Sequence, residues 1–575
     1  MSRRSLRLLC VMSVAALLLA PQLLGGTYYI FLLIIIFIFS IAAIGLNILG
    51  GHGGQFSLGH AALMAMGAYV STIVSQALFS LPFFAASGLH VWIGLIVGTT
   101  VGAATGAALA YPALRVRGPY LAMVTVAFGW VVWKILQEWV SVTGGDLGIA
   151  SIPKPQIGAW VLDTRHFYYI VLLLFIVSLG LQHWLMSSPI GLRIRAVKHS
   201  EIGLASVGVN VYRLKVWMFI ISAAFAGCAG ALFAIQQNYI SPDNFQFFSS
   251  VFLLLAILFG GPGTFLGPVV GIAILTLLPE FLHDFDRYRL IVYGGFILVT
   301  LYFLPRGVMG PIESRLRPGV APRSGCVVPV SGRLGIAGLA VKLEQISLNF
   351  GGLKALSRVD ISLASGEVHA VIGPNGAGKT TLVNVLTGFY QPSEGRVLID
   401  GQPRALTSLH ASARLGLART FQTIKLFGDM SVLDHVVIGL PAGYENPADE
   451  ADGLIDFVGL SAFRDSPASS LAYGHRRLLE IARALATRPR LLLLDEPAAG
   501  LVQEEIAKLI DLIHTLRHSG ITILLIEHHM DLVMAVSNRI TVLNYGNVIA
   551  RGTPTDIQGN AQVVEAYLGP SHVHA

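Results

Sequence analysis

The chain has 575 residues, of which 54% are apolar and only 12% are charged. Soluble domains carry about 25% charged residues, so this composition excludes a wholly water-soluble protein. The formal net charge is +7, but the basic residues flank apolar runs or lie in the C-terminal part, without interleaved aromatic residues. This pattern indicates membrane orientation rather than nucleic-acid binding. Cys10, Cys228 and Cys326 are too widely spaced to indicate a disulfide framework or a metal site.

The first 26 residues place three arginines ahead of an apolar run from Leu8 to Leu24. Both a cleaved signal peptide and a first membrane span fit this arrangement. Because no clean small-x-small cleavage site follows, we expect a membrane span.

Further apolar runs of spanning length follow in the N-terminal half. They lie at about 28–49, 57–78, 90–112, 119–138, 166–186 and 213–236. Basic residues gather in two of the connecting loops, at Arg115 and Arg117 and between Ser187 and Arg213. The positive-inside rule places these loops and the N-terminus in the cytoplasm, and the loop at 140–165 outside.

The stretch from Phe259 to Pro268 reads F-G-G-P-G-T-F-L-G-P and cannot continue a regular helix cheaply. We expect it to form a cytoplasmic turn between two short spans, Asn244 to Phe259 and Leu266 to Leu282. The segment from His283 to Arg289 is then outside, and a last crossing returns the chain to the cytoplasm. This gives about ten spans in total.

Glycines break the apolar pattern between Gly50 and Gly59. Two interpretations remain open: close helix packing, or irregular backbone that lines a cavity. His52 and His60 are expected to be structural rather than ligands.

The composition changes after Pro305, where Pro, Gly, Arg and Ser dominate up to Gly338. This indicates a linker. We therefore expect a transmembrane domain at 1–308, a linker at 309–338 and a second domain at 339–575, in which strand-like and helix-like runs alternate as in an α/β fold.

A phosphate-binding loop lies in this second domain, where Gly373 to Thr380 match G-x-x-x-x-G-K-[ST]. A β run from Glu367 to Ile372 precedes it and a helical run from Thr380 to Leu386 follows, which is the context that the pattern requires. The glycines let backbone amides turn toward phosphate oxygens, and the helix start is positive. The residues expected to hold the nucleotide phosphates are Gly373, Pro374, Asn375, Gly376, Ala377, Gly378, Lys379, Thr380 and Thr381. Lys379 is expected to reach the β- and γ-phosphates, and the Thr380 hydroxyl to ligate Mg²⁺.

Two apolar strands end in polar residues that complete this chemistry. The first runs from Leu491 to Asp495 and is followed by Glu496. Asp495 is expected to hold Mg²⁺ through water, and Glu496 to polarise the attacking water. The second strand ends in Glu527 and His528, and His528 is there a candidate sensor of the γ-phosphate.

The order of these motifs resembles the nucleotide-binding domain of an ABC transporter over about residues 340–575. The motifs are Phe350, G-P-N-G-A-G-K-T, R-T-F-Q at Arg419 to Gln422, L-A-Y-G at Leu471 to Gly474, L-L-L-L-D-E-P and I-E-H. Together with E-P-A-A-G-L and the tail E-A-Y-L-G, they resemble importers of branched-chain amino acids. In the apolar half, G-L-N-I-L-G-G-H-G-G-Q-F-S-L-G-H and G-G-P-G-T-F-L-G-P resemble that family's permease subunit. The chain thus resembles one permease fused to one ABC ATPase.

The resemblance implies a role for each matching residue. Phe350 would stack on the adenine of ATP, Glu496 would act as general base and His528 would hold the γ-phosphate. Gln422 would sense Mg²⁺ and the attacking water. The signature loop would cap the ATP of a partner domain, and it consists of Leu471, Ala472, Tyr473, Gly474 and His475.

Three residues depart from the ABC pattern. Ala472 lacks the usual serine hydroxyl, and His475 stands where an amide or acid is usual. Val502 stands where this subfamily has Asn, so its side chain cannot donate a hydrogen bond across the ATPase dimer. We expect weakened communication between the two ATP sites.

The implied function is ATP-driven import of branched-chain or other hydrophobic amino acids, with ATP hydrolysis coupled to alternating access. The expected location is the bacterial inner (plasma) membrane, with the ATPase domain in the cytoplasm. The expected partners are a second permease and ATPase domain, a periplasmic or extracellular substrate-binding protein and membrane lipid, without nucleic acid. An exporter or flippase, and an ATP-gated channel or sensor, are the alternatives.

With an ATPase in the chain, the loop from Ser187 to Arg213 gains a second interpretation. It is either a basic loop flanking the membrane or a carrier of a coupling helix that docks on the nucleotide-binding domain. We favour the coupling helix, at Glu201 to Val209 with its end near Gly208.

Overall fold

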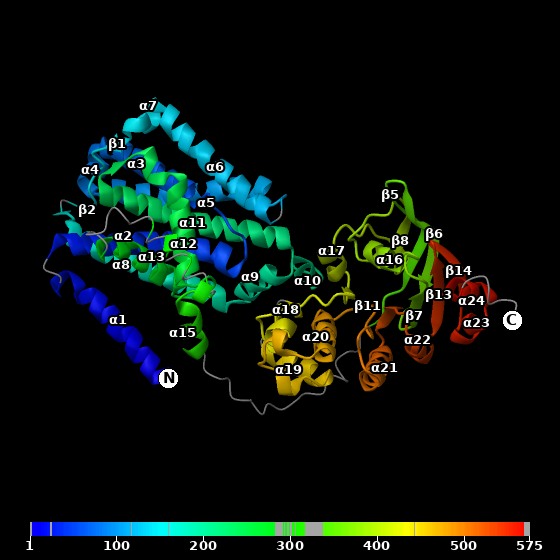
Figure 1. Cartoon of the computed structure of the whole chain (residues 1–575). Helices are drawn as coiled ribbons and strands as arrows, with labels where there is room; N and C mark the ends of the chain where they lie inside the picture. Colours follow the sequence, from blue (N-terminus) through cyan, green and yellow to red (C-terminus); the bar gives the residue numbers. More distant parts are fainter. Residues whose placement is uncertain are drawn as a thin grey trace. The chain divides into compact units, whose positions relative to one another are not determined.

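The computed structural model describes residues 3–568 apart from 24–25, 117, 159, 282–290, 292–293, 296–297, 299–301, 305, 317–336, 442 and 445. The chain divides into two compact units. One, the helical unit, comprises Met1–Lys198 and Tyr212–Val320; the other, the α/β unit, comprises His199–Val211 and Ala321–Ala575. The first is built of apolar helices and the second of helices and sheets (Figure 1). This confirms the predicted fold class of a polytopic membrane domain followed by an α/β P-loop domain.

The helical unit contains α1 (Arg3–Leu23), α2 (Thr27–Leu46), α3 (His60–Phe79), α4 (Pro82–Ser87), α5 (Leu89–Ala113), α6 (Pro119–Glu138), α7 (Val140–Thr143), α8 (Thr164–Ser187), α9 (Pro189–His199), α11 (Val211–Gln237), α12 (Phe247–Gly260), α13 (Gly267–Phe281) and α15 (Met309–Leu316). Among the described residues, seven helices are long and apolar enough to cross a membrane. Two shorter apolar helices, Val14–Leu23 and Gly267–Glu280, accompany them. Helix α2 packs between α8 and α13 (Figure 1). The predicted outside segment 283–289 lies outside the described residues, as does much of the predicted last crossing.

Glycines set the distance between α3, α5 and α11. On α5 they recur at every fourth residue, at Gly94, Gly98, Gly102 and Gly106. A Cβ at Gly102 would lie 2.9 Å from the Cα of Gly227 in α11, and one at Gly98 would lie 2.5 Å from the Gly67 carbonyl oxygen in α3. Small residues at this spacing let helix backbones touch, which is how helices associate where lipid removes the hydrophobic driving force.

The predicted break between two short spans is confirmed, because α12 ends at Gly260 and α13 begins at Gly267. The connecting residues 261–266 contact a π-helix, Asn47–His52, that follows α2. Asn47 joins them: its Oδ1 accepts a hydrogen bond from the Gly263 amide (2.9 Å), and its Nδ2 donates to the Thr264 carbonyl oxygen (2.9 Å).

The glycine-rich stretch from Gly50 to Gly59 combines irregular backbone with the predicted close helix packing. Its first residues belong to the irregular π-helix, whereas Gly59 provides close packing, since a Cβ there would lie 2.7 Å from the Thr125 carbonyl oxygen of α6. The buried His60 lies 3.1 Å from Ser57 Oγ and 2.7 Å from Ser222 Oγ of α11, which is the structural role expected of it.

Two sheets form the frame of the α/β unit. The six-stranded sheet has the order β10-β11-β12-β7-β13-β14, and the four-stranded sheet has the order β6-β5-β8-β9. The strands are β5 (Val341–Phe350), β6 (Leu353–Leu363), β7 (Val368–Ile372), β8 (Glu394–Ile399), β9 (Gln402–Pro403), β10 (Leu417–Arg419), β11 (Leu491–Asp495), β12 (Thr522–Ile526), β13 (Arg539–Asn544) and β14 (Asn547–Gly552). In the larger sheet β10, β11, β12, β7 and β13 are parallel and β14 is antiparallel. All residues of β7, β11 and β12 are buried, as continuous apolar runs in a sheet covered on both faces require.

Helices cover these sheets and support the loops at the strand ends. They are α16 (Lys379–Leu386), α17 (Leu409–Arg414), α18 (Val432–Gly439), α19 (Pro447–Phe457), α20 (Tyr473–Ala486), α21 (Gln503–His518), α22 (Met530–Val536), α23 (Pro554–Gln558) and α24 (Ala561–Leu568). Because the carboxyl ends of parallel strands share one edge of a sheet, the residues after β7, β11 and β12 come together.

Candidate functional site

The loop between β7 and α16 has the backbone shape that a phosphate-binding loop needs. Gly373 has φ +151°, and a Cβ there would overlap the Leu543 carbonyl oxygen. Gly378 has φ +100°, and a Cβ there would lie 2.7 Å from the Ala355 carbonyl oxygen. Only glycine fits both positions, and the loop ends at the N-terminus of α16.

Lys379 points back into this loop. Its amine donates hydrogen bonds to the carbonyl oxygens of Gly373 (2.6 Å) and Pro374 (3.0 Å). Burial lowers the pKa of Lys379, and the negative charges of Glu496 and Asp495 oppose that shift. The lysine therefore brings a positive charge to the loop and is held by the loop's own carbonyl groups.

Asp495, at the end of β11, is buried beside an arginine that the sequence analysis had not assigned a role. Its Oδ2 lies 2.9 Å from a guanidinium nitrogen of Arg419, whose other terminal nitrogen donates to Asn384 Oδ1 (2.6 Å). Burial raises the pKa of Asp495, and the Arg419 charge opposes that shift. The Oδ1 atom is buried without a hydrogen-bond partner among the described residues. A buried carboxylate oxygen of this kind, with the exposed Thr380 at the start of α16, fits a hydrated divalent cation.

Glu496 holds a backbone conformation that is rare outside glycine, with φ +46°. Its amide donates to the Ile526 carbonyl oxygen (2.8 Å) of β12, which fixes the turn. Its carboxylate accepts a hydrogen bond from Gln422 Nε2 (3.0 Å), and His528 Nδ1 lies 3.9 Å from the same oxygen. The structure thus brings Gln422, Glu496 and His528 together at the strand ends.

Phe350 and the signature loop each have aromatic neighbours of their own. The Phe350 side chain is half exposed, and its ring centroid lies 5.0 Å from that of Tyr390. In the signature loop, the His475 ring lies 4.6 Å from the Phe463 ring. Within the described part of the chain, no hydrogen bond or ring contact joins residues 471–475 to the P-loop.

Comparisons with known proteins match each half of the chain to a protein family. The family profile for the "Branched-chain amino acid transport system / permease component" matches residues 28–301, and the ABC transporter profile matches residues 356–499. A profile for the branched-chain amino acid ATP-binding cassette transporter matches residues 547–569. The high-affinity branched-chain amino acid transport ATP-binding protein LivG of Escherichia coli K12 is 43% identical over 248 residues, which cover 40% of this chain and 97% of LivG. The permease protein LivM of Salmonella typhimurium LT2 is 32% identical over 304 residues, which cover 49% of this chain and 69% of LivM.

This chain belongs to the branched-chain amino acid ABC transport family. LivM-like and LivG-like parts follow one another, so the transporter chain fuses a permease to an ATPase. It is a multi-pass membrane protein with a cytoplasmic ATPase domain, and ATP hydrolysis is coupled to transport. A crystal structure of a nucleotide-free ATP-binding cassette from an ABC transporter is 33% identical, with a TM-score of 0.38, and the match covers 40% of this chain and 98% of that chain.

The transporter's ATPase also contains a buried charged triad that sequence reasoning missed. Arg477, Glu480 and Arg483 follow one another at helical spacing on α20, and all three are buried. Glu480 Oε2 lies 3.0 Å from an Arg477 nitrogen, and burial raises the pKa of Glu480 while both arginines oppose the shift. The R-x-x-E-x-x-R spacing in the sequence was the available signal, because such charges share one helix face.

Arg477 connects this triad to the catalytic cluster. Its guanidinium donates hydrogen bonds to the carbonyl oxygens of Phe421 (2.7 Å), Gln422 (3.2 Å) and Glu496 (3.3 Å). One side chain thus holds the backbone on both sides of the Gln422–Glu496 contact. These hydrogen bonds also explain why Glu496 remains in its strained backbone conformation, because several contacts hold that conformation at once.

A short helix is present in the stretch Glu201 to Val209 that was predicted as a coupling helix; it ends at Ala205, earlier than predicted, and belongs to the α/β unit. It is α10 (Glu201–Ala205), with the Ser200 hydroxyl accepting a hydrogen bond from the Gly203 amide (3.0 Å) and Gly208 in a left-handed conformation (φ +83°) after its end. A Cβ at Gly203 would lie 2.8 Å from the Lys425 carbonyl oxygen. Glu480 accepts a hydrogen bond from the Lys425 amide (3.2 Å), so α10 packs on the residue that the buried triad holds.

Proposed function

We propose that the chain drives the uptake of branched-chain or other hydrophobic amino acids across the bacterial inner membrane, with ATP hydrolysis coupled to alternating access. The observation that carries this proposal is the fusion itself: an importer-type permease and its ATPase occupy one chain, and the ATPase keeps a P-loop and the cluster of Gln422, Glu496 and His528.

We assign the following roles in ATP hydrolysis. Phe350 stacks on the adenine, and residues 373–381 hold the phosphates. Thr380, Gln422 and Asp495 would hold Mg²⁺, which would supply positive charge to balance that of the phosphates. Glu496 orients the attacking water and accepts its proton, while His528 contacts the γ-phosphate.

The assembled transporter contains two ATPase domains and two permease domains. The absence of contact between residues 471–475 and the P-loop in the described chain supports a site completed by a second ATPase. A substrate-binding protein outside the membrane delivers the amino acid. In the cytoplasm, Gln422 relays the state of the ATP site to α10, by way of the contacts of Arg477, Glu480 and Lys425.

Transport measurements test this proposal. The full-length chain is purified with the subunits that accompany it, reconstituted with its binding protein, and supplied with leucine, isoleucine or valine and ATP. Accumulation above the external concentration is expected, and Lys379→Ala should abolish it. Equilibration without accumulation would indicate a channel, and ATP-driven movement in the opposite direction would indicate an exporter.

A further inference from the structure

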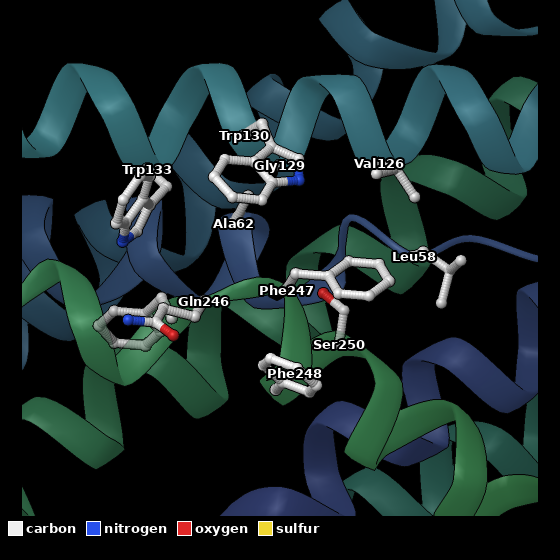
Figure 2. A pocket seen from close by; sticks show the side chains of 11 residues that line it. Leu58, Ala62, Val126, Gly129, Trp130, Trp133, Gln246, Phe247, Phe248 and Ser250 are labelled. Carbon is white, nitrogen blue, oxygen red and sulfur yellow. The ribbon is translucent and has the colours of Figure 1, made fainter.

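An open pocket of about 350 Å³ lies where α3, α6 and the start of α12 converge in the helical unit, and Trp130 and Phe248 on its rim are exposed. Five of its eleven lining residues are aromatic: Trp130 and Trp133 come from α6, and Phe245, Phe247 and Phe248 lie around the start of α12. Figure 2 shows both tryptophans on the side of the pocket opposite Phe247. We call it the aromatic pocket. Sites for small molecules typically measure about 300–1,000 Å³ and have this apolar lining, so the size suits a ligand as large as an amino acid.

Two contacts give the walls of the pocket a fixed shape. The Trp130 and Trp133 rings meet edge to face, with centroids 5.3 Å apart and an angle of 86°. Ser250 Oγ accepts a hydrogen bond from the Ala61 amide (3.0 Å), which ties α12 to the start of α3. The pocket therefore belongs to the packed helix framework.

The few polar atoms of the pocket favour an amino acid over a lipid chain as its ligand. The Trp133 Nε1 atom is buried and has no hydrogen-bond partner among the described residues, and Figure 2 shows it on the ring edge that faces Gln246. Gln246 stands directly before α12, so the positive end of that helix lies at the same end of the pocket. A hydrocarbon chain would leave the indole N–H unpaired, at a cost, whereas a carboxylate accepts it.

Charge sets the second limit on the ligand. None of the eleven described residues that line the pocket is charged. A charged ligand side chain against the apolar walls would lose its hydration without gaining a partner, whereas the α-carboxylate and α-ammonium of the ligand lie at the polar end, beside the Trp133 N–H and the Gln246 side-chain amide. An aliphatic or aromatic side chain would instead be buried against rigid rings.

We propose that the aromatic pocket is a substrate site that takes the uncharged side chain of a hydrophobic amino acid, from valine up to phenylalanine, with the α-carboxylate at the Trp133 edge. This rests on the proposed function and adds a location and a size range to it. It excludes acidic and basic amino acids as ligands of this pocket.

A matched pair of glycines allows a direct test. Gly129 lies on the pocket wall, and a Cβ there would lie 3.9 Å from the Leu58 carbonyl oxygen, so a larger residue fits locally but fills the cavity. Gly180 on α8 is exposed and has no atom within 4 Å of an added Cβ. We compare Gly129→Leu with Gly180→Leu in the full-length chain, purified with its accompanying subunits in lipid nanodiscs, and measure binding of tritiated leucine and phenylalanine.

Gly129→Leu should weaken binding of both amino acids by about tenfold or more because it overfills a packed site, and Gly180→Leu by less than about twofold. A second pair keeps an aromatic ring but removes the indole N–H: Trp133→Phe should weaken leucine binding by about fivefold through loss of one hydrogen bond, against no change for the exposed Trp184→Phe. Unlabelled phenylalanine should displace leucine, and glutamate and arginine should not.

Unchanged amino acid binding in Gly129→Leu and Trp133→Phe would overturn the assignment of the pocket as a substrate site. The absence of amino acid binding to the wild type would also overturn it. Loss of co-purified phospholipid from Gly129→Leu without loss of leucine binding would assign the pocket to an acyl chain and likewise overturn it. The uptake experiment stands apart: uptake with unchanged binding in the variants rejects only the pocket, and pocket-dependent binding without ATP-driven uptake rejects only the import proposal.

Discussion

The helical unit and the α/β unit keep their interiors close-packed by opposite means. In the helical unit, backbones touch where glycines leave room, as Gly102 and Gly227 do between α5 and α11. In the α/β unit, the interior holds full charges, such as Arg477 and Glu480 on α20 and Arg419 beside Asp495.

This difference follows from what surrounds each unit. In lipid the hydrophobic effect does not drive helices together. Their association therefore depends on close van der Waals contact between small residues. In the α/β unit, buried charges are tolerated because each is paired with an opposite charge. These pairs also hold loops that lie outside the apolar core. The helical unit should therefore be sensitive to added volume, and the α/β unit to removed charge.

The largest effect is expected in the catalytic cluster. Glu496→Gln should retain ATP binding and lower ATP turnover by about 10²–10⁴-fold, since an amide cannot accept the proton of the attacking water. Phosphate release and nucleotide binding by the purified complex measure this. The exposed Glu504→Gln is the control, and near-normal turnover in Glu496→Gln would reject the assignment.

Removal of a buried charge should be the next largest effect. Arg477→Met leaves Glu480 with one arginine and frees three backbone carbonyl groups, so it should lower the free energy of unfolding by about 3–5 kcal/mol. Arg488→Met removes an exposed pair with Glu450 and should cost no more than about 1 kcal/mol. Denaturant unfolding of the full chain, followed by signals from the α/β unit, compares them. An equal loss of unfolding free energy in the two variants would contradict the view that buried charges hold the α/β unit together.

A substitution that adds volume between two helices tests how closely the helical unit is packed. A Cβ at Gly230 of α11 would overlap the Met64 backbone of α3, so Gly230→Ala should cost about 1–3 kcal/mol of stability. Gly180→Ala, on the open face of α8, should cost little. Thermal unfolding of the detergent-solubilised chain gives the comparison, and indifference to Gly230→Ala would mean that the helices are not held by glycine contact.

A buried histidine gives the α/β unit a pH dependence. His435 Nε2 accepts a hydrogen bond from the Phe427 amide (2.8 Å), and burial lowers its pKa from 6.5 to about 3. Between these values the unfolded chain binds a proton that the folded chain does not, so stability falls as pH falls below 6.5, by about 1.4 kcal/mol per unit. Hydrogen exchange across α18 at pH 7 and pH 5.5 measures this. His435→Gln should flatten the dependence, and an equal slope in the variant would assign it to other groups.

The smallest effect concerns the departure at position 502. Val502 is 62% exposed, so Val502→Asn should leave the stability of the folded chain within about 0.5 kcal/mol of the wild type. A restored hydrogen bond across the ATPase dimer should raise the Hill coefficient of ATP hydrolysis. Identical Hill coefficients would show that this position does not couple the two ATP sites.

Features that lie within short stretches of chain could be predicted from the residues alone. The P-loop between β7 and α16, the strand ending at Asp495 and the short helix α10 were placed within a few residues, because glycine, cap and strand signals act locally. The break between α12 and α13 was found in the same way, from prolines and glycines that cannot continue a helix.

Which distant groups meet depends on how the helices and strands pack in the folded chain. The glycines of α5 follow a visible four-residue spacing, but their contacts with Gly67 and Gly227 depend on how three helices pack. Arg477 was visible as a helical charge, whereas its bonds to the backbone at Gln422 and Glu496 require the fold. The aromatic pocket joins residues of α3, α6 and α12 that no motif connects. A local pattern fixes the conformation of its own residues, but a site assembled from separate elements exists only once packing has brought them together.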